Sequence, residues 1–407
     1  MDFCARPDLI PVETALSLMQ QALDPILESE TVSLLDSLDR VLTAPLYSNI
    51  NVPSADNSAM DGYAFKLTDD LSTLQIVGDS LAGHPYAGEI RSGECVRITT
   101  GGIVPKGADT VIMQEQVERN GNVIRINVRP HLGENIRRAG EDSAKGSMVL
   151  SQGHRITPID IGLIASLGIT EVQVYRRLKV ALLSTGDELT PLGKPIEDGK
   201  IYDSNRYTLN ALLQRLHVET IDLGLQPDTP EIIKKSFTQA MKIADVVIST
   251  GGVSVGDADF TKDVLAELGN IYFWKVAIKP GKPFAFGKIG NCWFFGLPGN
   301  PVSAAITYHQ LVLPSLRYLS GEIFNSAPKL NAITQQKFSK QPGRADYQRG
   351  ILTSENDTNY VASTGVQGSG VLTSLAKANC FIVLEQERGK VEKDEIVKIL
   401  PFDKFIL

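Results

Sequence analysis

DVVISTGGVSVGDADFTKDVL (245–265), KVAIKPGKPFAFG (275–287) and WFFGLPGNPVSAA (293–305) form the stretch of sequence that decides the fold. This stretch holds three glycine-marked turns, each beside an apolar run, and two of the turns lead straight into a helical pattern. Its first apolar, β-branched run, 245–249, is typical of a buried parallel strand. The rest of the chain can then be interpreted as structure that builds or frames a site at these turns.

The turns have the composition of an anion-binding site. The adjacent glycines of the TGG turn (250–252) let the backbone approach a ligand, and successive N–H groups there can bind an anion. In the turn 298–301, Asn300 suits a helix N-cap and Pro301 suits the first helical position. The start of such a helix favours phosphate, because its N–H groups are free and its dipole is positive.

Each of these features also has an ordinary structural explanation. A single Thr-Gly-Gly turn is more often a plain connection from strand to helix, and lysines in turns are usually solvated. However, all three turns lie beside apolar strands of one α/β unit, and Lys275 and Lys279 come from a single segment between them. Together these features predict a site for a polyanion, with nearby carboxylates to hold a divalent metal ion.

Composition narrows the class of protein. The chain has 407 residues, 43% of them hydrophobic and 21% charged, with a formal net charge of −7. The length predicts two to four domains. The acidic charge disfavours a nucleic-acid or membrane-surface binder, and no apolar run approaches the roughly 20 residues of a membrane helix. Scattered cysteines indicate reduced thiols, and without a signal pattern we expect a cytoplasmic protein.

The N-terminal residues predict a small linker domain. Helical patterns cover residues 11–27 and 34–42, but neither stretch has room for a core of its own. Residues 147–178 indicate a strand, a helix and a strand, with Thr157 as the cap and Pro158 at the first helical position. We expect this later piece to pack with the N-terminal helices, so that one domain is formed from two parts of the chain.

A β-rich domain, residues 51–142, is predicted to be inserted between those two parts. It is rich in glycine and short strands, and the runs 111–118 and 123–128 flank Asn-Gly, a strong hairpin signal. Turn chemistry can explain its polar clusters DNSAMDGY and RITTGG, but it leaves a functional role equally open. A third cluster, NIRRAGED, is either a surface ion pair or an anion clamp, because arginine forks match oxyanion geometry.

From residue 179 onward, strands alternate with helices. Strands are expected at 180–184, 219–223 and 246–249, and helices at about 205–216 and 231–244. This alternation predicts a doubly wound parallel sheet, in which ligands bind beyond the carboxyl ends of the strands. Polar turns after these strands supply hard oxygen ligands suited to Mg²⁺, namely Asp187, Glu188, Asp228, Asp257 and Asp259.

The last part of the chain, residues 328–407, shows short β segments separated by glycine-rich turns, which indicate a small β barrel or sandwich. Arg344 and Arg349 there face either the neighbouring site or water. The predicted fold class is therefore multidomain α/β plus β. Its parts are a discontinuous linker domain (1–50 and 143–178), an inserted β domain (51–142), a doubly wound α/β domain (179–327) and a C-terminal β domain (328–407).

Eight motifs make the sequence resemble the molybdopterin molybdenumtransferase family, which comprises bacterial MoeA and the E domain of gephyrin. The resemblance covers essentially the whole chain, and the RITTG motif has TTG where relatives can have MTG. The motifs are DNSAMDGYA (56–64), RITTG (97–101), NIRRAGED (135–142), STGDEL (184–189), STGGVSVGDADF (249–260), KVAIKPGKPFAFG (275–287), LPGNPVSA (297–304) and PGRADYQRG (342–350).

The resemblance implies a four-part homodimer with a dimerisation role for the linker domain, a C-terminal β barrel and no fused adenylyltransferase domain of the gephyrin type. It implies a Mg²⁺-dependent reaction that inserts molybdate into adenylylated molybdopterin, releasing AMP and forming molybdenum cofactor. Contacts with the molybdopterin adenylyltransferase and with maturation proteins of molybdoenzymes are expected, and contacts with nucleic acid or membrane are not.

The resemblance also implies roles for individual residues. Asp61, Asp142, Glu188 and Asp228 match catalytic positions, and Asp187, Glu188 and Asp228 are the candidate ligands of the metal. Thr100, Arg137, Thr250, Gly251, Gly252, Ser254, Asp259, Lys275, Lys279, Pro298, Gly299, Asn300, Pro301, Arg349 and Ser369 match substrate-binding positions. Among these, Lys275, Lys279, Arg349 and Ser369 match positions associated with the molybdate oxyanion.

Three other functions remain open at this point. The adenylyltransferase that makes the adenylylated pterin uses the same kind of sheet, although the additional β domains argue against it. A non-catalytic scaffold of the gephyrin type would need a partner peptide, and nothing in the sequence indicates one. A nucleotide-binding module without specificity would bind adenylate without any dependence on molybdate.

Overall fold

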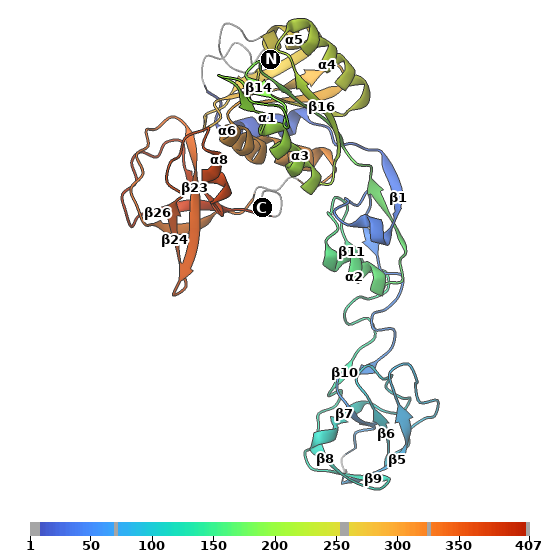
Figure 1. Cartoon of the computed structure of the whole chain (residues 1–407). Coiled ribbons are helices and arrows are strands. Elements are labelled where there is room, and N and C mark those ends of the chain that lie inside the picture. Colours follow the sequence, from blue (N-terminus) through green and yellow to red (C-terminus); the bar gives the residue numbers. More distant parts are fainter. Residues whose placement is uncertain (1–8, 69–71, 253–259, 324–326, 404–407) are drawn as a thin grey trace. The chain divides into compact units, whose positions relative to one another are not determined.

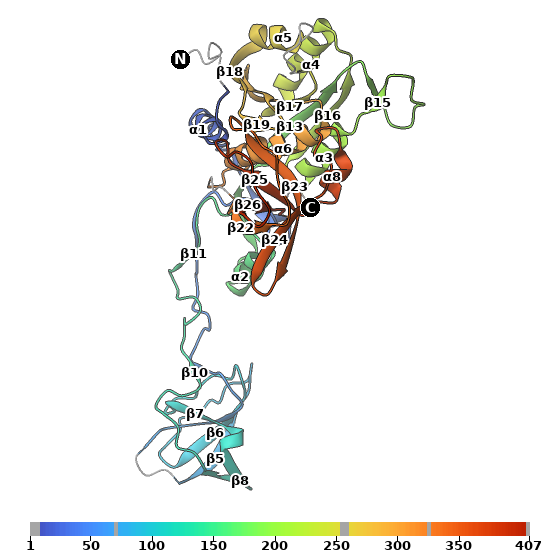
Figure 2. The same ribbon diagram turned by 90° about the vertical axis from the view of Figure 1, so that its left-hand side faces the viewer.

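The computed structural model describes residues 9–68, 72–252, 260–323 and 327–403, and the chain divides into two compact units (Figures 1 and 2). Unit 1 comprises Met1–Glu30, Asp39–Thr43 and Gln173–Leu407, and unit 2 comprises Thr31–Leu38 and Ala44–Val172. Within the described ranges, no helix is both long and apolar enough to cross a membrane. The finer division into four domains stays a prediction.

Unit 2 contains a six-stranded sheet in the order β7-β4-β6-β5-β9-β8. Its strands are β4 (Gly62–Phe65), β5 (Thr73–Ser80), β6 (Glu94–Ile98), β7 (Thr110–Met113), β8 (Val117–Asn120) and β9 (Val123–Ile126). The Asn-Gly hairpin is confirmed as β8–β9, where Gly121 has a φ of +61°. The single strand expected at 111–118 is wrong, because the 3-10 turn η3 (Gln114–Gln116) sends β7 and β8 to opposite edges of the sheet.

Unit 2 also holds the predicted helix that follows the inserted domain, α2 (Pro158–Ser166). Thr157 accepts a hydrogen bond from the N–H of Asp160, whose carboxylate accepts one from the N–H of Thr157. This capping box fixes the start of the helix. Strand β2 (Leu46–Tyr47) pairs with β11 (Met148–Leu150), so chain from before and after the insertion meets here. The N-terminal helix, in contrast, belongs to unit 1, where Val12, Ala15 and Met19 are part of the core of the α/β sheet.

The second N-terminal helix, expected at 34–42, does not form. In its place, β1 (Ser29–Ser33) leads into a four-residue 3-10 helix, η2 (Leu34–Ser37). Asp39 then has a φ of +59°, a left-handed conformation that ends a right-handed helix. The spacing of the leucines therefore predicted too long a helix. The helical segment ends after Ser37, and Asp39 turns the chain away from a helical path.

Unit 1 is organised around a second six-stranded sheet, in the order β16-β13-β17-β21-β20-β18. Its strands are β13 (Lys179–Thr185), β16 (Glu219–Gln226), β17 (Val246–Thr250), β18 (Gly269–Lys275), β20 (Pro283–Ile289) and β21 (Cys292–Leu297). The first four strands in this order are parallel, whereas β20 and β18 are antiparallel to their neighbours. The predicted parallel, doubly wound sheet is therefore confirmed for four strands. The pair β20–β21 is antiparallel, since the two-residue link between these strands is too short for a crossover.

Helices cover both faces of this sheet, as a doubly wound fold requires (Figure 2). Val180 and Leu182 of β13 pack in the core shared with α1 (Val12–Ala22), α3 (Asn205–Arg215) and α6 (Pro301–Thr307). Their neighbours Ala181 and Leu183 pack in the core shared with α4 (Pro230–Ile243) and α5 (Phe260–Leu268). Alternate residues of one strand thus face different helical layers.

The long helical run expected up to residue 319 is confirmed, with one irregularity. A π-helical turn, η4 (Tyr308–Val312), lies between α6 and α7 (Leu313–Leu319). Ser303 and Thr307 of α6 are buried, as are Tyr308 and Leu311 of the π-helical turn. The run therefore forms part of the interior of unit 1 and fixes the turn that precedes it.

The C-terminal part of unit 1 is a closed barrel rather than a sandwich. Five strands pair in a ring, β23-β24-β22-β26-β25 and back to β23. They are β22 (Leu330–Thr334), β23 (Ala345–Glu355), β24 (Thr358–Ser363), β25 (Cys380–Leu384) and β26 (Ile396–Pro401). A short strand, β19 (Ile278–Lys279), pairs with β23 and connects the barrel to the α/β domain, and a short helix, α8 (Leu372–Ala376), precedes β25.

Candidate active site

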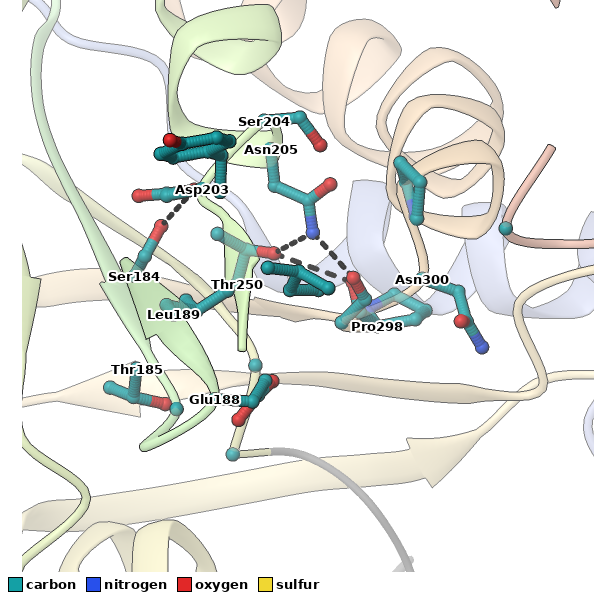
Figure 3. Close-up of a pocket in the computed structure, with 18 of the residues that line it drawn as sticks. Ser184, Thr185, Glu188, Leu189, Asp203, Ser204, Asn205, Thr250, Pro298 and Asn300 are labelled. Carbon is teal, nitrogen blue, oxygen red and sulfur yellow. Dashed lines mark hydrogen bonds between the residues drawn. The ribbon is translucent and has the colours of Figure 1, made fainter. Parts of the chain in front are cut away.

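A cavity of about 800 Å³ lies at the carboxyl ends of the parallel strands of unit 1 (Figure 3). The turns that follow β13, β17 and β21 line it, as does the segment before α3. A ligand site at this edge is what the parallel strands predict. The lining includes Thr185, Gly186, Glu188, Asp203, Asn205, Asp228, Thr250, Gly251, Gly252, Pro298, Gly299, Asn300 and Pro301.

The TGG turn requires its glycines. Gly251 has a φ of +86° and Gly252 a φ of +64°, both in the left-handed region that side chains disfavour. A Cβ atom on Gly251 would also overlap the carbonyl oxygen of Thr185, at the end of the neighbouring strand β13. The turn can therefore bring its backbone to the cavity only because two adjacent residues have no side chain.

Asn205, which the sequence analysis did not single out, joins the two glycine turns (Figure 3). Its Nδ2 donates to Thr250 Oγ1 at 2.8 Å and to the carbonyl oxygen of Gly299 at 2.7 Å. Asp203, two residues earlier and 1% exposed, accepts from Ser184 Oγ and from the Arg206 guanidinium. The available signal was a short polar segment, Asp-Ser-Asn, directly before a predicted helix.

The start of α6 confirms the expected positions of Asn300 and Pro301 but corrects their chemistry. Asn300 is the N-cap and Pro301 the first helical residue, yet the Asn300 side chain makes no capping hydrogen bond. The N–H of Val302 donates to the carbonyl oxygen of Ser369, at 3.0 Å. The loop before α8 therefore uses one N–H donor at the start of α6. Fewer N–H groups remain there for an anion than the sequence suggested.

Three carboxylates gather beside the cavity after β13 and β16. The N–H of Asp228 donates to Asp187 Oδ1 at 3.4 Å, and Glu188 lines the cavity with Asp228. Burial of Asp228, and the negative charges of Asp187 and Glu188, raise the pKa of the Asp228 carboxyl. Its buried Oδ1 has no hydrogen-bond partner, which is unusual for a buried polar atom and fits a group that binds a cation or a proton.

These carboxylates do not form a complete metal site by themselves. Within the described part of the chain, no three His, Cys, Asp or Glu side chains are arranged to hold a metal ion. Asp187 is exposed and is not among the residues that line the cavity. The assignment of Asp187, Glu188 and Asp228 as metal ligands stays a prediction. Two further predicted residues, Ser254 and Asp259, lie outside the described residues, as does Asp257.

The four residues expected at the molybdate oxyanion lie in different surroundings. Lys275 is exposed at the end of β18, and Ser369 lies beside the start of α6. Arg349, in contrast, is 1% exposed within the barrel strand β23, where it donates to Ser374 Oγ and to the Gly368 carbonyl oxygen. Arg349 therefore has a structural role in the barrel that the sequence did not reveal.

Lys279 lines a second cavity of about 430 Å³, which lies between β19 and the barrel. Its Nζ pairs with the carboxylate of Asp346 at 3.0 Å, and 48% of the Lys279 side chain is exposed. Lys340 and Arg344 also line this cavity. The Lys340 ammonium is buried and its N–H groups donate to three backbone carbonyl oxygens, which satisfy its hydrogen bonds but do not neutralise its charge. Three cations against one carboxylate give the cavity a positive charge.

In unit 2, the three polar clusters of the inserted domain lie together. Strand β3 (Asn57–Ser58) pairs with β10 (Ile136–Arg137), which joins the first cluster to the third. Thr100, from the second cluster, donates through both its N–H and its hydroxyl to the exposed carboxylate of Asp61. The N–H of Thr100 is the main reason why the pKa of Asp61 is lowered.

The arginines of the third cluster differ in their contacts. Arg138 pairs with Asp56 at 2.7 Å although 59% of its side chain is exposed, and Arg137 and Asp142 are exposed as well. The structure thus brings the sequence-predicted residues of unit 2 onto one connected set of loops. Their part in the reaction stays a prediction.

The described geometry now allows comparison with known proteins. Residues 181–318, which hold the sheet and the first cavity, match the family model of a probable molybdopterin binding domain. The site therefore belongs to the class of molybdopterin-binding α/β proteins. Residues 10–168 match the MoeA N-terminal region (domain I and II), and residues 331–402 match the MoeA C-terminal region (domain IV). The chain belongs to the MoeA family.

Individual relatives agree with this assignment. The molybdopterin molybdenumtransferase of Haemophilus influenzae is 49% identical over 403 residues, covering 98% of this chain and 100% of the relative. That of Nostoc sp. is 33% identical over 93% of this chain and 90% of its own. The crystal structure of the molybdopterin biosynthesis moeA protein of Pyrococcus horikoshii is similar with a TM-score of 0.83 and 30% identity, covering 97% of this chain and 100% of that chain.

Proposed function

We propose that this protein inserts molybdenum into adenylylated molybdopterin, in a reaction that uses molybdate and releases AMP. The family and its named molybdenumtransferases support this activity. The observation that carries the proposal is the cavity that places two glycine turns beside Asp228 and its neighbouring carboxylates. A phosphoanhydride presents several anionic oxygens, which backbone N–H groups and a metal ion can bind together.

Mg²⁺ is the metal that we propose for this cavity. Asp228 fits it, because its Oδ1 is buried without a partner. Asp187 and Glu188 lie near enough for their charges to raise the pKa of Asp228, so we propose them as the neighbouring source of oxygen ligands. Mg²⁺ is usually held by one or two carboxylates together with substrate phosphates, so an incomplete protein cluster suits it. When bound, the ion would neutralise phosphate charge and polarise the P–O bond that breaks.

The cations of unit 1 have a separate role in the proposal. Molybdate and the phosphoanhydride are both anionic, so their approach is opposed by electrostatic repulsion. Lys275 and Lys279 are exposed cations that offset this repulsion, and Lys279 lies in a cavity with two further cations. We assign molybdate attraction to these lysines, and we assign Arg349 the additional task of holding the barrel loop 367–369 in place.

The deciding experiment measures AMP release from adenylylated molybdopterin with and without molybdate. We expect release that depends on molybdate in the wild-type protein and a loss of roughly a hundredfold in Asp228→Ala, typical of removing a group that stabilises charge in the transition state. An adenylyltransferase would instead form the adenylylated pterin from a nucleotide. Release at the same rate without molybdate would overturn the proposal.

We further propose that the protein works as a homodimer in the cytoplasm and receives its pterin substrate from the adenylyltransferase. The family resemblance supports these three proposals. If two chains together complete one site, mixing two inactive variants should restore activity. Asp61→Ala and Asp228→Ala lie in different units, so mixed dimers would regain up to one working site. Light scattering would report the oligomeric state, and no recovery of activity in proven mixed dimers would contradict the shared site.

A further inference from the structure

The hydrogen bonds of Asn205 point to a function beyond connecting two loops. Nδ2 of Asn205 carries two N–H donors, and both are used, one on Thr250 Oγ1 and one on the carbonyl oxygen of Gly299. A carbonyl oxygen can only accept, and the Thr250 hydroxyl donates its own proton to the Pro298 carbonyl oxygen at 3.4 Å. Both groups that face Asn205 are therefore acceptors, which fixes the orientation of its amide.

The consequence concerns the peptide between Gly299 and Asn300. A trans peptide is planar, so its C=O and its N–H point in opposite directions. When Asn205 holds the carbonyl of Gly299, the N–H of Asn300 is turned away from α3. In the described structure, neither the N–H of Gly299 nor that of Asn300 has a protein acceptor, and both residues line the cavity.

Gly299 gives the peptide freedom that this contact must restrict. A Cβ atom placed on Gly299 would meet, as its nearest neighbour, the Cα of Gly251 at 3.9 Å, so no side chain packs closely against this position. Without a donor at position 205, the peptide can rotate and present its carbonyl oxygen to the cavity instead. A carbonyl dipole of that orientation would repel a phosphate that the N–H attracts.

We propose that Asn205 is a positioning residue that holds the Gly299–Asn300 peptide so that its N–H, which belongs to Asn300, is available to a phosphate oxygen of the substrate. This inference rests on the proposed function, since the phosphate belongs to the pterin or to the adenylate of the adenylylated pterin. Asn205 does not touch the phosphate in this account. It acts through the backbone of Gly299, and through Thr250 it keeps the TGG turn at a fixed distance from the same peptide.

The test compares ligands that differ only in the phosphate. Asn205→Ala is expected to weaken AMP binding about tenfold, the effect of one hydrogen bond to a charged group, while adenosine binding stays unchanged. The same comparison with molybdopterin, a pterin phosphate, shows whether the adenylate or the pterin phosphate is held. Weakening of either phosphate ligand supports the inference, and unchanged affinity for both overturns it.

Two further variants separate positioning from general damage. Asn205→Asp places a carboxylate, which can only accept hydrogen bonds, against the two acceptors Thr250 Oγ1 and the Gly299 carbonyl oxygen. It also adds a negative charge, so it should weaken AMP binding more than Asn205→Ala does. Asn210→Asp, on the same helix but outside the cavity lining, adds the same charge and should leave AMP binding unchanged. Equal loss of AMP and adenosine binding by Asn205→Ala, or a loss by Asn210→Asp as large, would contradict the positioning role.

The outcome is distinguishable from a failure of the proposed function. If the wild-type protein releases AMP in response to molybdate but Asn205→Ala binds both phosphate ligands normally, only the role of Asn205 is wrong. If the wild-type protein shows no such release, the proposed function itself has failed. Thermal unfolding of every variant is measured in parallel, since a positioning residue should change phosphate affinity more than stability.

Discussion

At the scale of single residues, the site depends on groups that are costly for the folded protein. Asp228 has a buried oxygen without a partner and two acidic neighbours, and these raise its pKa. Gly251 occupies a backbone conformation that other residues avoid. Such features persist where function requires them. Replacing Asp228 should therefore change stability and activity in different directions, and replacing Gly251 should show how much the close approach of its backbone contributes.

The raised pKa of Asp228 predicts a pH-dependent effect on stability. A carboxyl whose pKa is higher in the folded state favours folding below its unfolded pKa of about 3.9, and that contribution is lost as the pH rises through the folded pKa. Asp228→Asn removes the ionisation. In urea denaturation at several pH values, its advantage in the free energy of unfolding over the wild type should therefore grow as the pH rises from the unfolded pKa through the raised folded pKa, and stay constant above it.

The same variant should lose activity while gaining stability. An amide cannot supply the negative charge that we propose for Mg²⁺ binding, so molybdate-dependent AMP release should fall by roughly a hundredfold. If Asp228→Asn were less stable than the wild type at neutral pH, the carboxylate would be stabilised by a partner, and the account of its unpaired oxygen would be wrong.

Gly251 allows a matched comparison with another glycine. Gly251→Ala should destabilise the protein by about 2–4 kcal/mol, because it combines a positive φ with overlap on the Thr185 carbonyl. Gly193→Ala has a φ of +82° but open space around its Cβ, so strain alone of about 1–2 kcal/mol is expected. Chemical denaturation measures both, and equal losses would remove the role of the close approach.

At the scale of elements, alternating strands and helices were predictable because the central strands of the α/β sheet, such as β13 and β17, contain continuous buried apolar runs. Buried parallel strands such as β17 give this signal directly, and the turn after each one was then placed at the correct edge. The antiparallel arrangement of β20 was missed because an apolar run does not encode direction. The helix expected at 34–42 failed because Asp39 adopts a left-handed conformation that leucine spacing cannot reveal.

The same distinction applies to the candidate site. Glycines and carboxylates next to strands were predictable, since their types match anion and metal binding. Asn205 was not, because its role depends on two acceptors about 45 and 94 residues away in the chain, which no local pattern shows. Likewise, its position in a motif predicted that Arg349 binds the molybdate oxyanion. Its burial and its contacts with Ser374 and Gly368 are evident only in the folded structure.

Arg349 and Lys279 should therefore differ when each is replaced by alanine. Arg349→Ala should destabilise the protein by about 2–4 kcal/mol, since it leaves a void in the barrel and removes hydrogen bonds from a buried charged group. Lys279→Ala removes a half-exposed cation and one hydrogen bond from the buried Asp346 carboxylate, so it should cost about 1–2 kcal/mol, less than Arg349→Ala, while raising the KM for molybdate. Urea denaturation and steady-state kinetics would separate the two, and a stable Arg349→Ala would contradict its structural role.

At the scale of the whole molecule, two units with separate cores predict two responses to damage. Phe65 is buried in the core of unit 2 and Phe237 in that of unit 1, and replacing either with alanine should cost about 3–5 kcal/mol. Calorimetry should show that each variant lowers its own unfolding transition. AMP should raise the transition of unit 1 alone, and a single transition that shifts in all cases would show that the units unfold together.

The reliance of the first cavity on peptide groups has a consequence for how selection and engineering act on it. The N–H of Gly251 is used by the carbonyl oxygen of Leu297, so the main-chain donors that we propose for phosphate are those of Gly252, Gly299 and Asn300. At these positions the backbone matters more than the side chain. An alanine scan would then detect positioning residues such as Asn205, but it would not detect the main-chain N–H groups that contact the phosphate. Replacing a single backbone amide by an ester deletes one N–H donor and no side chain, so the resulting loss of phosphate affinity would measure the contribution of that donor.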